Sequence, residues 1–516
     1  MPSFSISVAL RGQYNLATAG VSTFSTTGSI SQGGNQLTVA DASGFTTGDS
    51  LIVKIGGESG AGARGTVGVG GTWPDLSYAN KTAMDLDTSK PNGTYSYRAD
   101  TGAVYISTGG VWSPEDTVNR YYTASVIPRS LVATVSGKAG NVLTLGGGIT
   151  AAVASSGATV YFDNAPRVAT AIAGLTDNTT IVWPAGNYAM SASMNINSET
   201  AHTNMKIKGA GVASTMLFFP DGISNQGVIV ISQATSPIVS DLTVKATARV
   251  PGYMMWAGAG ATMYSYGISF SACPNVRTYD TKSIDAFQGG ISLSACASPV
   301  ITRHNSVLTE GLPQYVQWQI LGANCTNGRY IDCQVNSAKL TGGIEWFAST
   351  GCSFENYTGV NASMSVNGSS NWTISNANIT VQAGTYVSEP SFARNNPLIN
   401  INSNIGPSGA GTISNVTITQ NAVVSSGNDT LRGIIVNLGI EGVVIDGGTI
   451  TLPDYTAPST LQGASGVNSD GVGTIVQNLT VIGAIKPAQS TYGNVTLNST
   501  GHYHNITGTV VGGTPF

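Results

Sequence analysis

The acidic residues that could catalyse a hydrolysis lie at matching positions of neighbouring segments. Acids are scarce, with 26 Asp and Glu among 516 residues. When the three segments are aligned, Asp285 and Glu310 occupy the same position. Lys339 lies near this position in the third segment, and Glu345 lies further along the third segment. A glycosidase needs two carboxyl groups, one to donate a proton and one to attack or activate water. We predict Asp285 and Glu310 as the catalytic pair, with Glu345 as the reserve partner. The aligned segments are KSIDAFQGGISLS (282–294), SVLTEGLPQYVQWQI (306–320) and QVNSAKLTGGIEWFA (334–348).

Polar and aromatic residues accompany these acids in the same three segments. The alignment stacks Ser292, Gln317 and Glu345 at one position. Aromatic rings lie in the same band, and the flat apolar face of such a ring is a suitable platform for a sugar. The predicted substrate-binding residues are Tyr315, Gln317, Trp318, Lys339 and Trp346.

Structural roles remain open for several of these residues. Trp318 and Trp346 alternate with Gln317 and Glu345, so tryptophans would point into a core if the polar residues point outward. Asp285 and Glu310 also fit solvated corner positions. Lys339 could pair with Glu310 as a surface ion pair of little consequence.

No pattern in the chain indicates a metal or another cofactor. A calcium-dependent lyase needs a cluster of acids to hold the cation through oxygen atoms, and no such ladder is found. His502 and His504 lack further ligands nearby and fit an exposed strand end. The cysteines form no CxxC pair, so we expect small buried side chains in a core stack. They are Cys273, Cys296, Cys325, Cys333 and Cys352.

The composition favours an all-β protein and excludes several partners. Charged residues make up 9% of the chain and apolar residues 41%, with 65 glycines and a net charge of −4. β-Branched residues separated by turn formers are typical of strands. No basic stripe indicates nucleic acid, and no apolar run is long enough to span a membrane. The N-terminal residues lack the charged and apolar regions of a signal peptide.

Short strand units recur through most of the chain. Each contains a strand, a polar turn with Asn, Asp or Arg, and a second strand, at intervals of roughly 20 to 40 residues, as in solenoids. Because one unit cannot bury its apolar face alone, neighbouring units must stack. A parallel β-helix fits best, with Asn or Thr ladders at its corners; a β-sandwich or propeller is the alternative. The units are 236–246, 298–308, 327–337, 353–363, 371–381, 411–421, 442–452 and 474–484.

A different pattern precedes these units. Residues 33–53 resemble residues 139–162, which indicates paired strand units of one head domain. Between them, Asp100-Thr101-Gly102 predicts the turn of a hairpin. A helix is then predicted from Asp163 or Asn164 as its cap, with Val168, Ile172 and Leu175 on one face and Pro166 in the first turn.

The order of these elements resembles a known family. A helix, the segment Trp183-Pro184-Ala185-Gly186-Asn187-Tyr188, the sequence KIKGAG and then Asn/Thr-rich units are similar to the pectate-lyase-like right-handed β-helix of phage tailspikes. The resemblance covers roughly residues 160 to 510. It implies that the helix caps the first rung, that the protein is a homotrimer, and that it binds and often cleaves host surface polysaccharide.

We therefore predict an all-β protein, a right-handed parallel β-helix with an N-terminal β-rich head domain and a short capping helix. The predicted function is a tailspike of the virion that binds and hydrolyses host surface polysaccharide and contacts other phage tail proteins through its N-terminal region. A non-enzymatic adhesin of the same fold and a free polysaccharide-degrading enzyme are the alternatives. The predicted regions are an arm (1–26), the head (27–162), the capping helix and β-helix (163–455) and C-terminal rungs (456–516).

Overall fold

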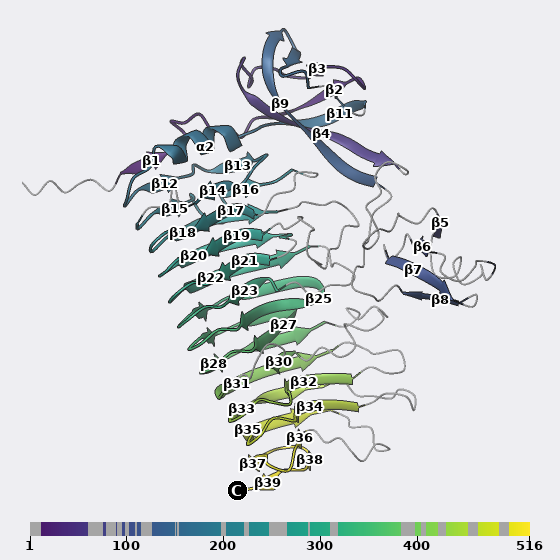
Figure 1. Ribbon diagram of the computed structural model, residues 1–516, viewed down its shortest axis with the longest axis vertical. Helices are drawn as coiled ribbons and strands as arrows, with labels where there is room; N and C mark the ends of the chain where they lie inside the picture. Colours follow the sequence, from purple (N-terminus) through teal and green to yellow (C-terminus); the bar gives the residue numbers. More distant parts are fainter. Residues whose placement is uncertain are drawn as a thin grey trace, which may run out of the picture.

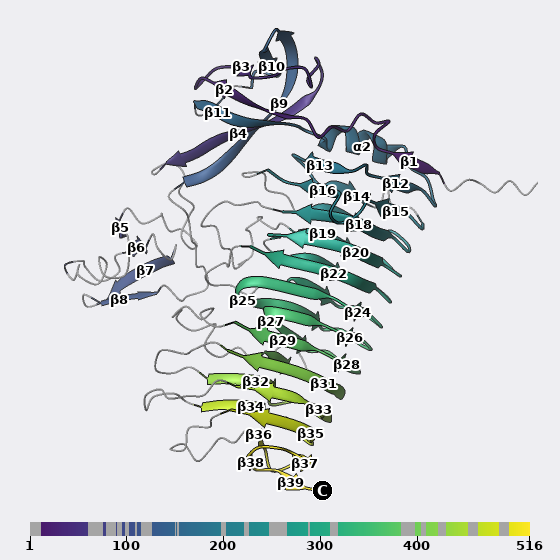
Figure 2. The ribbon, with the colours of Figure 1, turned by 180° about the vertical axis from the view of Figure 1, so that it is seen from behind.

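The chain folds into a small barrel followed by a long stack of parallel strands (Figure 1). Figure 2 shows the same arrangement from behind, with the barrel again at one end of the stack. The computed structural model describes residues 12–59, 76–78, 89, 95–98, 103–108, 111–114, 126–149, 151, 154–197, 203–220, 227–246, 266–286, 289–309, 318–382, 398–403, 409–421, 430–452, 463–483 and 495–516.

The barrel joins the two similar segments near the N-terminus to each other. Leu37 lies opposite Leu143, and Ile52 lies opposite Tyr161, in antiparallel pairs. The similarity between the segments therefore reflects strands that are direct neighbours. The barrel is closed in the order β10 (Val142–Leu145), β3 (Gln36–Val39), β2 (Ser25–Ile30), β11 (Ser155–Phe162), β4 (Ser50–Ser59) and β9 (Val126–Ala139).

A separate small sheet lies between β4 and β9 in the sequence. Its strands β6 and β7 are antiparallel, with Arg98 opposite Ala103. This pairing confirms the predicted hairpin, whose turn residues lie outside the described residues. The sheet contains β5 (Leu76–Tyr78), β6 (Tyr95–Arg98), β7 (Ala103–Thr108) and β8 (Val111–Pro114).

The helix α2 (Ala165–Ala173) lies over the first rung of the stack (Figure 1) and is the one helix of the described residues. Val168 and Ile172 are buried in the core, as the sequence predicts. The cap differs in detail: the Asn164 side chain makes no cap hydrogen bond to the helix. The Asp163 carboxylate instead accepts from the Ala165 amide at 3.1 Å and from the Ser50 hydroxyl at 2.8 Å. Asp163 thus joins the helix start to the barrel.

The stack is a parallel β-helix of 29 strands with three faces. All its strand pairs are parallel, so each rung hydrogen-bonds to the rungs above and below it, and long strands turn a corner from one face to the next. The first face consists of β1 (Gln13–Asn15), β12 (Thr180–Val182), β15 (Lys206–Lys208), β24 (Arg329–Ile331), β26 (Ser353–Glu355), β28 (Trp372–Ser375), β37 (His502–His504), β39 (Thr514–Pro515) and the first parts of β18 (Ile238–Lys245), β20 (Arg277–Ile284), β22 (Val300–Leu308), β31 (Gly411–Gln420), β33 (Val443–Thr451) and β35 (Ile475–Ile482).

The other two faces complete each rung. The second contains the remaining parts of those corner-turning strands together with β13 (Gly186–Ala189), β16 (Thr215–Phe218), β29 (Asn378–Val381) and the first parts of β25 (Gln334–Phe347) and β27 (Thr358–Asn367). The third contains the ends of β25 and β27, β14 (Met194–Ile196), β17 (Gly227–Ser232), β19 (Tyr266–Ser271), β21 (Gly289–Ser294), β23 (Ile320–Ala323), β30 (Ile399–Asn402), β32 (Thr430–Val436), β34 (Gly463–Ser469), β36 (Val495–Leu497) and β38 (Val510–Val511).

Asparagine ladders mark the corners, as the sequence predicts. Asn356 donates to Asp332 at 2.9 Å, and Asn376 donates to Asn356 at 3.1 Å. All three residues have a positive φ. This left-handed conformation is uncommon for other L-residues, but Asn and Asp adopt it several-fold more often. The same side chains therefore bend the strand and link successive rungs.

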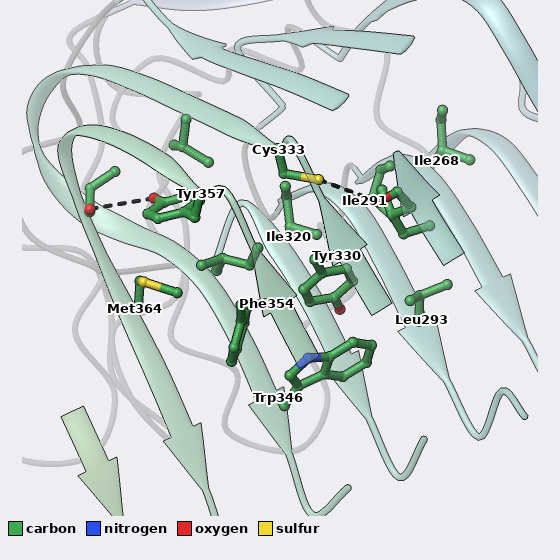
Figure 3. Packing of buried hydrophobic residues seen from close by; sticks show 14 of the residues in the cluster. Ile268, Ile291, Leu293, Ile320, Tyr330, Cys333, Trp346, Phe354, Tyr357 and Met364 are labelled. Atoms are coloured by element: carbon green, nitrogen blue, oxygen red, sulfur yellow. Dashed lines mark hydrogen bonds between the residues drawn. The ribbon is translucent and has the colours of Figure 1, made fainter. Parts of the chain in front are cut away.

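The core fills the space between the three faces with stacked side chains (Figure 3). Tyr330 and Trp346 stack face to face with ring centroids 4.0 Å apart, and Phe354 lies beside both. All five cysteines are buried and unpaired, as predicted from their spacing. The thiols of Cys296 and Cys325 donate to the carbonyl oxygens of Ser294 and Ala323, each at 3.4 Å.

Candidate active site on the third face

Glu345 is a buried acid on the outer side of the third face. It lies near the end of β25, where its register neighbours are Leu321 on β23 and Ser365 on β27. Ile344 and Trp346, on either side of it in the strand, belong to the core. Because side chains alternate along a strand, Glu345 projects to the outer side. Only 4% of it is exposed.

Two polar side chains on the next rung hold this carboxyl group. The Ser365 hydroxyl donates to Glu345 Oε1 at 3.0 Å. The Asn367 side chain also hydrogen-bonds to it. Burial raises the pKa of Glu345 to about 7, while the hydrogen bonds from Ser365 and Asn367 act in the opposite direction. Burial has the larger effect because water no longer solvates the charged form.

The surroundings of Glu345 combine hydroxyl, amide and aromatic groups. In its column the register continues from Ser365 to Asn400, and one position further along the outer side lie Phe347 and Asn367. Phe347 is half-buried. Asn367 Oδ1 is buried and has no hydrogen-bond donor among the described residues. It can therefore accept a hydrogen bond from the protonated Glu345 beside it.

Asp285 occupies a different position, at the corner after β20. Its backbone has a φ of +48°. Its carboxylate accepts from the Thr309 amide at 2.8 Å and from the Thr309 hydroxyl at 2.9 Å. These bonds fit the corner role that the sequence left open. Glu310, the predicted partner, lies outside the described residues.

The register corrects the predicted alignment of the third face. Ser292 and Glu345 do share one column, but the residue between them is Leu321. The prediction that Gln317 fills this position is wrong, because β23 begins only at Ile320. The connection from the corner to this strand is longer in this rung than in the rung before, so counting residues from the corner misplaces the strand. Tyr315 and Gln317 themselves lie outside the described residues.

The two tryptophans lie in different environments. Trp346 points into the core between the three faces, where it stacks on Tyr330 (Figure 3). The prediction that it binds substrate is therefore wrong, and alternation with Glu345 explains its inward direction. Trp318 is half-buried ahead of β23. Lys339 lies within β25, and its side chain is outside the described part of the structure.

Ser365, Asn367 and Phe347 were missed by the sequence reasoning. Alignment of SMSVNG (363–368) with GIEWFA (343–348) would have placed Ser365 beside Glu345, since the register from Ile344 to Phe347 keeps one offset of 20 residues. The predicted alignment stopped one rung too early. No sequence signal, however, indicates that Glu345 is buried.

Comparison with known proteins leaves the family open. No protein-family model matches the chain, and no curated protein matches it. Solved structures that resemble it include the A-module of mannuronan C-5 epimerase AlgE6 from Azotobacter vinelandii, with 13% identity and a TM-score of 0.46 over 69% of this chain and 94% of that one. The catalytic unit of a GH87 alpha-1,3-glucanase from Streptomyces thermodiastaticus has 12% identity and a TM-score of 0.43 over 92% and 88%. ORF18 of Geobacillus virus E2 has 11% identity and a TM-score of 0.33 over 77% and 74%.

Neither a metal site nor a membrane-spanning helix is found among the described residues. No group of three or more His, Cys, Asp or Glu side chains could hold a metal ion within the described ranges. His502 and His504 are exposed on β37, and His504 Nδ1 lies 3.0 Å from the Phe516 carbonyl oxygen. Among the helices of the described residues, none is long and apolar enough to cross a membrane.

The chemistry available at Glu345 is proton donation near neutral pH. A carboxyl group with a pKa of about 7 is largely protonated in mildly acidic solution and half-protonated at neutrality. General acids in enzymes are tuned to this range, because they must carry a proton and still release it readily. Ser365 and Asn367 fix its orientation, and the rungs on both sides make its position rigid.

Proposed function

We propose that this protein is a phage tailspike that binds and hydrolyses a host surface polysaccharide, with Glu345 as the proton donor. The observation that carries the proposal is the Glu345 carboxyl group, which is buried on the outer side of the β-helix beside Ser365 and whose pKa burial raises to about 7. Glu355, by contrast, is half-buried and pairs with Arg329 at 2.7 Å. No cationic side chain of the described residues contributes to the raised pKa of Glu345.

In this mechanism Glu345 protonates the oxygen of the scissile glycosidic bond as that bond breaks. Ser365 holds the carboxyl group in place, and Phe347 offers an apolar surface to a sugar ring. We take the second carboxyl group of the reaction to be that of Glu310, which precedes β23 in the sequence and lies outside the described residues. Glu310 would attack the sugar or activate water, depending on its separation from Glu345.

The role in the virion is supported by the resemblance to tailspikes in the helix and in residues 183–188. The helix α2 covers the first rung, which shields its edge from pairing with other strands. We propose a homotrimer, because the long polar faces can pack in parallel around a threefold axis, and attachment to other tail proteins through the N-terminal region. Light scattering tests the assembly: a mass of one chain would contradict it.

A non-enzymatic adhesin is the second candidate. The observation in its favour is that no second carboxylate of the described residues acts on Glu345. An adhesin would use the same outer side to hold a polysaccharide without cleaving it.

Incubation with purified polysaccharide from the host surface separates the two functions. We expect new reducing ends to accumulate and the polymer to become shorter in size-exclusion chromatography, because hydrolysis creates one reducing end for each bond broken. Heat-denatured protein is the control. Stable binding of the polysaccharide without new reducing ends would identify the protein as an adhesin.

A further inference from the structure

A cavity lies between the barrel and the first rungs of the β-helix. Its volume is about 610 Å³, within the range of small-molecule pockets of roughly 300–1,000 Å³. The barrel contributes Lys54 from β4 and Tyr161 from β11. The β-helix contributes Asn187, Phe218 and Lys245 from three successive rungs of the second face. It therefore lies on another face and other rungs than Glu345.

The walls of this cavity are fixed by close contact between the barrel and the β-helix. Gly186 has a φ of +145°, and a Cβ atom there would lie 2.3 Å from Thr23 Cγ2 of the barrel. Only glycine permits this approach. Tyr161 and Phe218 meet edge to face across the junction, with ring centroids 5.4 Å apart. The two walls are thus in direct contact at the base of the cavity.

The described lining residues carry positive charge and no acid. Lys54 is exposed and Lys245 is half-buried, and neither Asp nor Glu occurs among the described residues of the lining. Phe218 and Lys245 are register neighbours on adjacent rungs. An aromatic ring and an ammonium group therefore lie side by side, with the exposed Asn187 amide and the Ser25 hydroxyl in the same lining.

We propose that this cavity binds an acidic sugar unit of a polysaccharide, with its carboxylate at Lys245 and its ring against Phe218 and Tyr161. Ammonium groups pair with carboxylates through charge-assisted hydrogen bonds. Aromatic rings accept the apolar face of a sugar, and Asn187 and Ser25 match its hydroxyl groups. A neutral sugar would bring no negative charge to the Lys245 ammonium group, and an acidic peptide would make no use of the ring pair. The site binds without cleaving, so it requires neither Glu345 nor hydrolysis.

Isothermal titration of the full chain with a hyaluronan tetrasaccharide tests the proposal, because this probe alternates glucuronate with a neutral sugar. We expect binding that is at least tenfold tighter than that of neutral chitotetraose. Lys245→Gln is expected to weaken binding by about tenfold, since it removes a charged hydrogen-bond donor. Asn187→Ala serves as a second variant and should weaken it less.

Matched controls distinguish binding in this cavity from binding elsewhere on the protein. Lys282→Gln removes a lysine on the next rung of the second face, outside the lining, and should leave affinity unchanged. Glu345→Gln should also bind normally, so failure of the proposed catalytic site would not affect the result. The proposal is overturned if the tetrasaccharide does not bind at millimolar concentration, if chitotetraose or tetraglutamate binds equally well, or if Lys245→Gln binds like the wild type.

Discussion

Replacement of Glu345 by Gln is expected to lower the rate of polysaccharide cleavage by roughly 10²- to 10⁴-fold, the usual contribution of a general acid. Glutamine has nearly the same shape, and its carbonyl oxygen can still accept the hydrogen bond that Ser365 donates to Glu345 at 3.0 Å. It cannot donate a proton to a leaving oxygen. Cleavage should therefore fail while the fold and polysaccharide binding persist, as measured by reducing ends and by co-sedimentation with the polymer.

Glu355→Gln is the matched control for this variant. Glu355 is also a strand glutamate, but it lies on the first face and pairs with Arg329. The Arg329 guanidinium holds the pKa of Glu355 below its usual value, so this carboxyl group stays charged and cannot serve as a proton donor at neutral pH. We expect normal cleavage. If Glu345→Gln cleaved as fast as Glu355→Gln, Glu345 would have no part in catalysis.

Replacement of Trp346 by Ala is expected to lower the free energy of unfolding by about 3–5 kcal/mol, as for other large core aromatics. The Trp346 ring is fully buried and stacks on Tyr330. It also fills the space beside Gly322 and Gly328, where a Cβ atom would lie 2.0 and 2.3 Å from the ring. The neighbouring glycines have no side chains that could move into the cavity, so the loss should not be relieved by repacking.

Guanidinium denaturation followed by circular dichroism measures this loss, and unfolding rates serve if the transition is irreversible. Trp318→Ala is the comparison, because Trp318 is half-buried and lies outside the strands. Trp318→Ala should lower the free energy of unfolding by a clearly smaller amount. Equal losses of unfolding free energy in the two variants would show that Trp346 does not form the centre of this core segment.

The repeats were predictable from sequence because the corners and strands have regular chemistry. In 353–363 and 371–381, an Asn that tolerates positive φ stands between two short strands, and both segments fold as predicted. The five cysteines were predicted to be buried core side chains because they form no CxxC pair, and all five are buried. The pairing of the two similar barrel segments also followed from matched strand positions such as Leu37 and Leu143.

The candidate site could be predicted only in part. Glu345 was recognised as an acid on a strand, and its column with Ser292 was right, but Leu321 lies where Gln317 was expected. The periodic pattern within strands carries no information about the length of the connections between rungs. The long connection before β23 therefore shifted the predicted alignment. The raised pKa of Glu345 depends on burial, which is set by the folded surroundings of the strand and not by its own sequence.

The pH dependence of kcat/KM for the wild type tests most directly whether Glu345 is the proton donor. A general acid must be protonated, so the rate should fall about tenfold for each pH unit above its pKa. With a pKa of about 7 for Glu345, we predict steady activity up to roughly pH 6 and a continuous decline from pH 7 to pH 9. Activity that declines already from about pH 4.5, the value of an ordinary glutamate, or that stays constant to pH 9 would contradict a proton-donor role for Glu345.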